Sequence, residues 1–113
     1  LDEIKTKRMT HLFIELWAMA NHNEFVAERL EASYHYVHQL IAQFVAQLNP
    51  RLGAEDAYTV ALFISASIEG STMLTGFGKP WSSMMPQMKG LAVKSLIHLV
   101  KTITPAELRA LAR

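Results

Sequence analysis

Apolar residues recur at helical spacing along most of the chain. Over residues 1–20 they follow the i, i+3, i+4 pattern of one helix face, and the same pattern returns over residues 24–48. Asn23 is a good N-cap for the second segment, and the Asn49-Pro50 pair ends it. The pattern therefore predicts a first helix followed by a long second one.

Two further helices follow from the same criteria. Glu55 and Asp56 lie favourably in the first turn of a helix over residues 54–75, which a glycine-rich break then ends. A fourth helix extends from about residue 83 to residue 103, and the capping box of residues 104–107 opens a short terminal helix. No segment shows the alternation of a strand. We therefore predict an all-α fold of four main helices plus a short C-terminal helix.

Composition points to a partner chain. The chain has 113 residues, of which 50% are hydrophobic and 19% are charged. This length fits a single helical domain over residues 1–113, and so high an apolar share leaves surface for a second copy, so we expect a homodimer. The net charge of +1 provides no field for DNA, RNA or anionic membranes, which excludes nucleic-acid binding by this chain itself.

The cellular context is indicated by what the sequence lacks. The absence of cysteine excludes disulfides and thiolate metal sites and fits a reducing cytoplasm. No signal peptide is visible, and because the chain opens with Leu1 instead of Met, we expect a missing N-terminal portion that holds part of the function. Residues 57–77 are about long enough to span a membrane, but Glu69 and the many hydroxyl side chains are costly there, so we expect no membrane association.

The third predicted helix carries unusually few charges. After Asp56 its only ionisable acid is Glu69, and no Lys or Arg occurs between Arg51 and Lys79. A helix with a water-facing side normally shows several charges. We therefore expect it to be covered on most sides, with one apolar face on its own domain and the other on a symmetry mate, where the fourth helix joins it.

One flank of this helix is polar, with a stripe formed by Tyr58, Ser65, Glu69 and Thr72. The commoner role of a carboxylate in such a place is structural, as a buried Glu69 bonded to a hydroxyl, a backbone group or a His. The alternative is that Glu69 lines a cavity and recognises a donor or a cationic group on a ligand. Gly70 beside it suits either a close helix approach or room for that ligand.

Other chemistry is weakly represented. Glu31, His35 and His38 fall at i, i+4 and i+7 on the second helix, which permits a divalent metal but also occurs by chance, so we predict no metal site and no cofactor. The chain has no Glu-x-x-His pair, no catalytic Cys and no glycine-rich phosphate loop, so we predict that it is not an enzyme. Aromatic and Met side chains on the inward faces form either an ordinary core or an adaptable apolar pocket.

Two segments resemble a known family. They are "HLFIELWAMANHNEFVAERLEASY", residues 11–34, and "ALFISASIEGSTMLTGFG", residues 61–78. They resemble the C-terminal regulatory domain of tetracycline-repressor (TetR) family transcription factors, in which a helix ending in a Leu-Trp-Ala-type run meets a turn and a long helix. A later apolar helix there often carries an Asp/Glu-Gly pair, here Glu69-Gly70. The likeness extends over about residues 6–103, and Asn23 stands where the family often has an Asp-Pro pair.

The resemblance implies a mode of action. Members are homodimers whose last two long helices form a four-helix interface, which maps here to the third and fourth helices. They bind a small, often apolar effector among the regulatory helices, and its binding shifts an N-terminal helix-turn-helix domain out of DNA register. That domain would precede Leu1, so DNA would be contacted only through the missing part.

We therefore predict the effector-sensing and homodimerisation domain of a cytoplasmic, bacterial TetR-type regulator, whose effector is small and apolar. Helical face and side-chain type select the expected ligand-binding residues: Phe13, Trp17, Tyr34, His38, Phe63, Glu69 and Met73. The expected dimer interface comprises Ile64, Ile68, Leu96 and Leu99. The main alternative is a stand-alone helical dimerisation or adaptor module without a small ligand. A more distant alternative is a metal-dependent helical protein that uses Glu31, His35 and His38.

Overall fold

The computed structural model describes residue 12, residues 14–76 and residues 78–113, and this part of the chain is almost entirely helical. Residues 14–20 form a helix, and the elements after it are α2 (Glu24–Leu48), α3 (Ala54–Thr75), the 3₁₀ turn η1 (Ser82–Met84), α4 (Met85–Thr102) and α5 (Pro105–Leu111). No strand occurs in the described part. The predicted all-α fold of four main helices and a short terminal one is confirmed.

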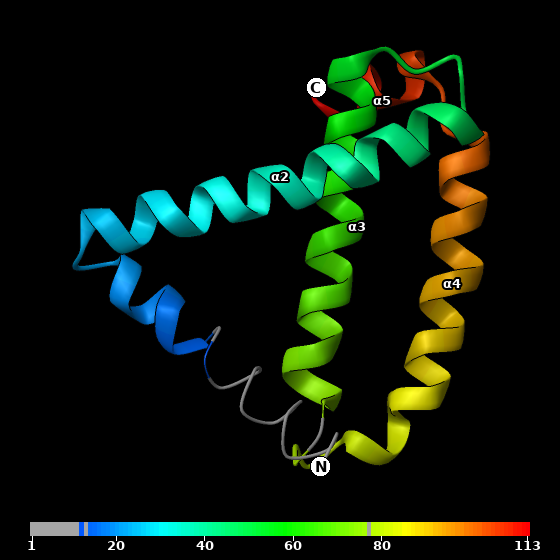
Figure 1. Cartoon of the computed structure of the whole chain (residues 1–113). Helices are drawn as coiled ribbons and strands as arrows, with labels where there is room; N and C mark the ends of the chain where they lie inside the picture. Colours follow the sequence, from blue (N-terminus) through cyan, green and yellow to red (C-terminus); the bar gives the residue numbers. More distant parts are fainter. Residues whose placement is uncertain (1–11, 13, 77) are drawn as a thin grey trace.

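The helices are arranged around α3 (Figure 1). α2 crosses α3, α4 returns alongside α3, and α5 packs beside the start of α3. Residues 14–20 fold back from the start of α2. Three faces of α3 are thereby turned to different surroundings.

Local capping signals set the helix bounds. Asn23 Oδ1 accepts a hydrogen bond from the Val26 amide at 3.2 Å, which satisfies one of the free N–H groups at the start of α2. Thr104 Oγ1 accepts from the Glu107 amide at 3.1 Å and donates to Glu107 Oε1, also at 3.1 Å. α4 begins two residues later than predicted, because η1 precedes it as a 3₁₀ turn.

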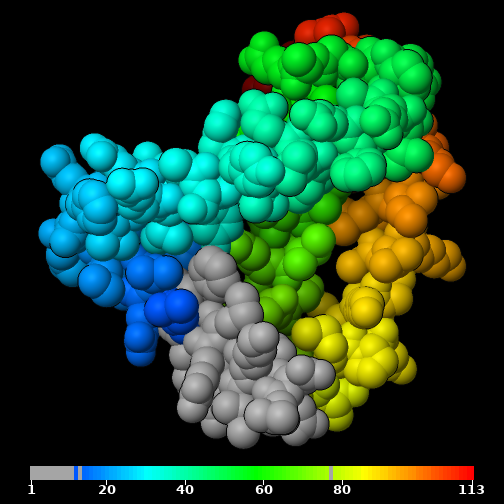
Figure 2. All heavy atoms as spheres, viewed as in Figure 1, coloured from blue at the N-terminus to red at the C-terminus, as the bar shows by residue number. Residues whose placement is uncertain are grey.

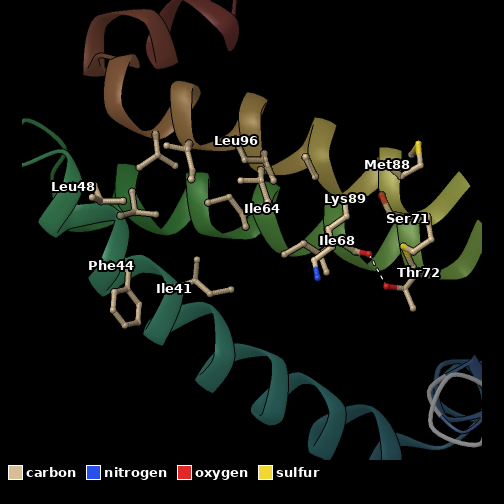
Figure 3. A pocket seen from close by; sticks show the side chains of 16 residues that line it. Ile41, Phe44, Leu48, Ile64, Ile68, Ser71, Thr72, Met88, Lys89 and Leu96 are labelled. Carbon is tan, nitrogen blue, oxygen red and sulfur yellow. Dashed lines mark hydrogen bonds between the residues drawn. The ribbon is translucent and has the colours of Figure 1, made fainter. Parts of the chain in front are cut away.

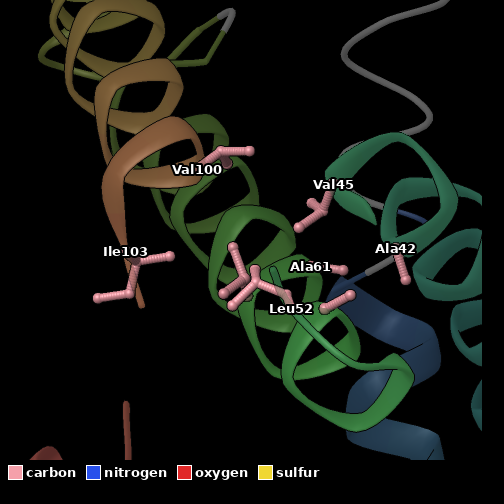
Figure 4. Packing of buried hydrophobic residues seen from close by; sticks show 8 residues of the cluster. Ala42, Val45, Leu52, Ala61, Val100 and Ile103 are labelled. Atoms are coloured by element: carbon pink, nitrogen blue, oxygen red, sulfur yellow. The ribbon is translucent and has the colours of Figure 1, made fainter. Parts of the chain in front are cut away.

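The buried apolar core lies where the end of α2, the start of α3 and the end of α4 meet (Figure 4). Its residues are Ala42, Val45, Leu52, Ala57, Val60, Ala61, Val100 and Ile103. Small residues dominate the α3 contribution, which lets α2 cross close to the α3 backbone. The core is therefore confined to one end of the α3–α4 pair.

A buried amide ties this end together. Asn49, which is 2% exposed, donates through Nδ2 to the carbonyl oxygens of Val100 at 2.9 Å and Ile103 at 2.8 Å. Its Oδ1 accepts from Arg51 Nε at 3.2 Å, and Arg51 Nη2 donates to the Lys101 carbonyl at 3.2 Å. The carbonyls at the end of a helix have no partners within it, so this Asn49 clamp fastens the end of α4 to the loop after α2.

Within the described part of the chain, α3 is covered on only part of its surface, and its predicted coverage by a second copy stays a prediction. Leu62, Phe63 and Leu74 are each about half exposed. A Cβ atom added at Gly70 would meet nothing within 4 Å, so none of the helices that the structure describes approaches closely there. These positions are therefore open for a partner.

Two glycines of this fold are expected to respond oppositely to substitution. A Cβ at Gly76 would run into the Thr72 carbonyl oxygen, so we expect Gly76→Ala to destabilise the fold by about 1–3 kcal/mol. A Cβ at Gly90, inside α4, would meet nothing within 4 Å, so we expect Gly90→Ala to stabilise it by about 0.5–1 kcal/mol. Urea denaturation followed by circular dichroism measures both, and equal stabilities for the two variants would contradict the contact at Gly76.

Candidate ligand-binding pocket

A cavity of about 680 Å³ opens where residues 14–20, α2 and α3 come together. Its lining residues are Trp17, Glu28, Glu31, Ala32, Tyr34, His35, His38, Tyr58, Leu62, Ser65, Ala66 and Glu69. We call it the acidic pocket. Its volume lies within the range of roughly 300–1,000 Å³ that is typical of small-molecule sites.

Helical periodicity brings these side chains to one place. The lining positions on α2 and on α3 are mostly three or four residues apart, so each helix presents one stripe to the pocket. On α3 the stripe runs from Tyr58 through Ser65 to Glu69. The N-cap at Asn23 sets where α2 begins and so fixes which of its faces is turned inward.

An aromatic stack forms one wall of the pocket. The ring centroids of Trp17 and Tyr34 are 5.3 Å apart, and those of Tyr34 and His38 are 5.8 Å apart. Trp17 Nε1 donates to the Tyr34 hydroxyl at 3.2 Å. Tilted rings at such distances attract one another, so the stack joins the helix of residues 14–20 to α2.

A continuous chain of hydrogen bonds connects α2 and α3 beside this wall. Gln39 Nε2 lies 3.3 Å from His35 Nε2, and His35 Nδ1 lies 3.1 Å from the Tyr58 hydroxyl. The same hydroxyl lies 3.4 Å from His38 Nδ1, and His38 Nε2 lies 3.1 Å from Ser65 Oγ. His38 is buried, and each step of this chain needs one donor and one acceptor.

The donor and the acceptor of every hydrogen bond in this series follow from the Gln39 side chain at its start. The Gln39 amide nitrogen can only donate, so His35 Nε2 accepts and His35 carries its proton on Nδ1. His35 then donates to Tyr58, and the single Tyr58 proton goes to His38 Nδ1. His38 is left with its proton on Nε2 and donates to Ser65. All four ring nitrogens of the two histidines thus have a partner within the protein, so neither has a free nitrogen to offer a ligand.

The charged groups of the pocket are all negative. Glu28, Glu31 and Glu69 are among the lining residues, and no Lys or Arg is. Burial raises the pKa of the Tyr34 hydroxyl above its ordinary value of 10.0, and its hydrogen bond to Glu69 and the charge of that carboxylate raise this pKa further. The hydrogen bond from Trp17 acts in the opposite direction. Tyr34 therefore stays protonated beside Glu69.

The structure brings together four of the seven residues predicted to bind a ligand. Trp17, Tyr34, His38 and Glu69 all line the acidic pocket. Phe63 does not, because its position is one residue along α3 from Leu62 and is rotated by about 100° away from the pocket. Met73 is 52% exposed and does not line the pocket. Phe13 lies outside the described residues.

Eight lining residues were missed, namely Glu28, Glu31, Ala32, His35, Tyr58, Leu62, Ser65 and Ala66, and the sequence contained clear signals for three of them. Tyr58 and Ser65 belong to the polar stripe that also contains Glu69, so helical spacing alone placed them on the same face. Glu28 lies three residues before Glu31 on α2, again on the same face. The stripe was interpreted as a flank of the helix, and only the crossing of α2 over α3 turns it into a wall.

The predicted interface residues lie on two other surfaces of α3 and α4. Ile64 and Ile68 line a concave surface between α2, α3 and α4 with a volume of about 600 Å³ (Figure 3). We call it the apolar groove. Its lining residues are Ile41, Phe44, Val45, Leu48, Ile64, Ile68, Ser71, Thr72, Met85, Met88, Lys89, Ala92, Val93, Leu96, Ile97 and Val100.

The third surface, which we call the outer face, lies between α3 and α4 without any contribution from α2. It is lined by Phe63, Ser67, Ser71, Met88, Leu91, Ala92, Ser95, Leu96 and Leu99. The structure thus separates the four predicted interface residues, because Leu99 lies on the outer face, Leu96 borders both surfaces, and the two isoleucines lie in the apolar groove. The residues are apolar as expected, but they do not form one face.

A metal site finds no support in the part of the chain that the structure describes. Those residues contain no group of three or more His, Asp or Glu side chains placed to hold a metal ion. The two imidazoles of the predicted triple use both ring nitrogens in the hydrogen-bond chain described above.

The all-helical fold, in which a long helix crosses an apolar helix beside a ligand-sized pocket, is that of a C-terminal regulatory domain of the TetR class. Residues 2–83 match the family described as the C-terminal domain of BetI-type transcriptional repressors. The chain belongs to this family, which comprises regulators of transcription and not enzymes, so the predicted resemblance is confirmed. Searches of curated proteins and of solved structures gave no significant match.

One helix of the described part could span a membrane by its length and composition. It is α3, with a mean hydropathy of 1.2. The same test is passed by core helices of soluble proteins. Membership of a family of transcriptional repressors explains an apolar helix at this place without a membrane.

Proposed function

We propose that this chain senses a small effector in the acidic pocket and dimerises, as the regulatory domain of a TetR-type repressor. The single observation that carries the proposal is that Trp17, Tyr34 and Glu69, from three separate helical segments, line one ligand-sized cavity that is open to solvent. Because one occupant would contact all three segments, its binding can favour one arrangement of them over another.

The pocket favours an effector with an apolar body and a cationic or N–H donor group. Three carboxylates offer acceptors, and the histidines offer no free nitrogen. The faces of Trp17 and Tyr34 attract positive charge as well as apolar surface. This extends the small apolar effector predicted from the sequence, for which Glu69 was already a possible partner of a donor or cationic group, because the crossing of α2 over α3 gathers Glu28, Glu31 and Glu69 around one cavity.

Dimerisation is proposed to use the outer face. Phe63 is 54% exposed and Leu91 is 63% exposed on it, and none of its lining residues is charged. A two-fold interface pairs one patch with itself, so an uncharged apolar patch is well suited to it. Family members of this type bind DNA through an N-terminal domain, and we propose that effector binding here promotes release of DNA by such a domain in the cytoplasm.

The effector class can be tested with matched small molecules. We expect phenethylamine to bind the chain at least about tenfold more tightly than phenethyl alcohol, because only the amine brings a charge to the carboxylates. In Glu69→Gln this preference should shrink by about tenfold, whereas Glu55→Gln, an exposed position in the first turn of α3, should leave it unchanged. Isothermal titration calorimetry measures both ratios.

Three outcomes would count against this proposal. Equal affinity of the chain for the amine and the alcohol would show that the carboxylates do not select the ligand. Loss of helical structure in Glu69→Gln would assign Glu69 to the structural role that the sequence also allowed. A folded dimer that binds neither compound would favour the adaptor module, for which the large exposed apolar surface is the supporting observation.

A further inference from the structure

The apolar groove has one polar end. Among its lining residues Lys89 alone is charged, and Ser71 and Thr72 are the only hydroxyl residues. All three lie toward the same end, because Thr75 Oγ1 is 3.5 Å from Met85 Sδ and the start of α4 is thus beside the end of α3. Figure 3 shows Lys89, Ser71 and Thr72 together at this end and Phe44 and Leu48 at the other.

The remainder of the groove is hydrocarbon. α2 contributes Ile41, Phe44 and Leu48, and α4 contributes Val93 and Ile97, with no acidic residue anywhere in the lining. Figure 2 shows the hollow between the middle of α3 and α4. Among the residues that the structure describes, no carboxylate lines the groove beside the Lys89 ammonium.

We propose that the apolar groove is a second ligand site, distinct from the acidic pocket, that takes an amphipathic anion with an unbranched hydrocarbon chain and a carboxylate. The chain would lie against the apolar side chains of α2 and α4, and the carboxylate would pair with Lys89. Thr72 Oγ1 already donates to the Ile68 carbonyl at 2.9 Å, which leaves the Ser71 hydroxyl and Lys89 as the donors for the anion.

A second copy of the chain is a poorer occupant of this groove. In a two-fold interface the groove would pair with itself and bring two Lys89 side chains against a surface without an acid. Burying ammonium groups without partners is strongly unfavourable. The outer face lacks this charge, so dimerisation and anion binding use different surfaces of α3 and α4.

The two ligand sites have opposite chemistry, so they can be tested apart. Decanoate, kept below its micelle concentration, is the probe, and decanol is its neutral counterpart. In equilibrium dialysis we expect the parent chain to bind decanoate at least about tenfold more tightly than decanol. Lys89→Gln should remove this difference, while its affinity for decanol should stay within about twofold of that of the parent chain. Lys94→Gln, an exposed position on α4 outside the groove, is the matched control.

Further variants separate this site from the proposed effector site and from folding. Ile97→Ser should weaken decanoate and decanol alike, since it removes apolar contact without touching the charge. Glu69→Gln should leave decanoate binding unchanged, so failure of the acidic pocket to bind an amine would not affect the result. All of these positions are at least partly exposed, and circular dichroism verifies that each variant folds.

Several results would overturn the proposal. One is equal affinity of the parent chain and of Lys89→Gln for decanoate. Another is a loss of decanoate affinity in Lys94→Gln as large as that in Lys89→Gln. Decanoate affinity that falls as the protein concentration rises would show that a second copy covers the groove. Sedimentation with phosphatidylglycerol vesicles in the absence of any decanoate binding would assign Lys89 to a lipid surface and not to a free carboxylate.

Discussion

Asn49→Asp is expected to destabilise the fold by about 4 kcal/mol or more, which is a large part of the stability of a domain of this size. The amide nitrogen of Asn49 donates to two carbonyl oxygens at the end of α4, 2.9 and 2.8 Å away, in a place that is 2% exposed. A carboxylate there would replace both donors with a negative charge that faces two acceptors. Asn49→Ala is expected to cost less, about 2–4 kcal/mol, since it only leaves the carbonyls unpaired.

The pH dependence of Asn49→Asp distinguishes charge from shape. The introduced carboxyl would have the Arg51 guanidinium on one oxygen, but its other oxygen would face two carbonyl acceptors in a buried place. The anion is therefore disfavoured in the folded state, and the pKa of the carboxyl should be higher when folded than when unfolded. The loss of stability should therefore be full above the folded pKa and should diminish as pH falls below it. Urea denaturation between acidic and neutral pH measures this, with Gln47→Glu on the exposed side of α2 as the control. A variant as stable as the parent at neutral pH would rule out the Asn49 clamp.

Leu91→Glu is expected to weaken dimerisation by about 100-fold or more. Leu91 is 63% exposed at the outer face, and a two-fold axis would bring two such carboxylates into one apolar interface. The fold of the single chain should be unchanged, because the side chain lies at its surface. Sedimentation velocity over a range of concentrations measures the effect.

Val93→Glu is the matched control for the outer face. It lies on the same helix and is 53% exposed, but it lines the apolar groove. We expect this variant to dimerise like the parent. If Val93→Glu dissociated the dimer and Leu91→Glu did not, the interface would lie in the groove, close to the predicted Ile64 and Ile68.

The helices could be predicted from the sequence because their signals are local. Asn23 and Thr104 cap α2 and α5 in the way their side-chain chemistry suggests, and both predicted starts agree with the structure. The start of α4 was placed two residues too early, because a 3₁₀ turn and an α-helix share the same side-chain preferences at this point. Element bounds thus depend on interactions within a few residues, which a sequence displays directly.

The candidate site was only partly predictable, since it depends on how helices cross. Trp17, Tyr34, His38 and Glu69 were chosen by face and type, and they line one pocket. Phe63 was chosen for its aromatic ring, but its angle on α3 turns it to the outer face. The low charge of α3 led to the prediction of a helix covered on most sides, but charge cannot show which of its faces is covered by its own chain.

The position of the core makes α2 a lever. Its buried contacts with the core lie near its C-terminal end, at Ala42 and Val45, while its other end extends beyond the crossing with α3. From Ala42 to Glu24 the helix spans about 27 Å, so a rotation of about 5° at the crossing displaces its start by about 2 Å. A slight shift of the crossing caused by a ligand is thereby amplified at the end of α2 to which residues 14–20 attach.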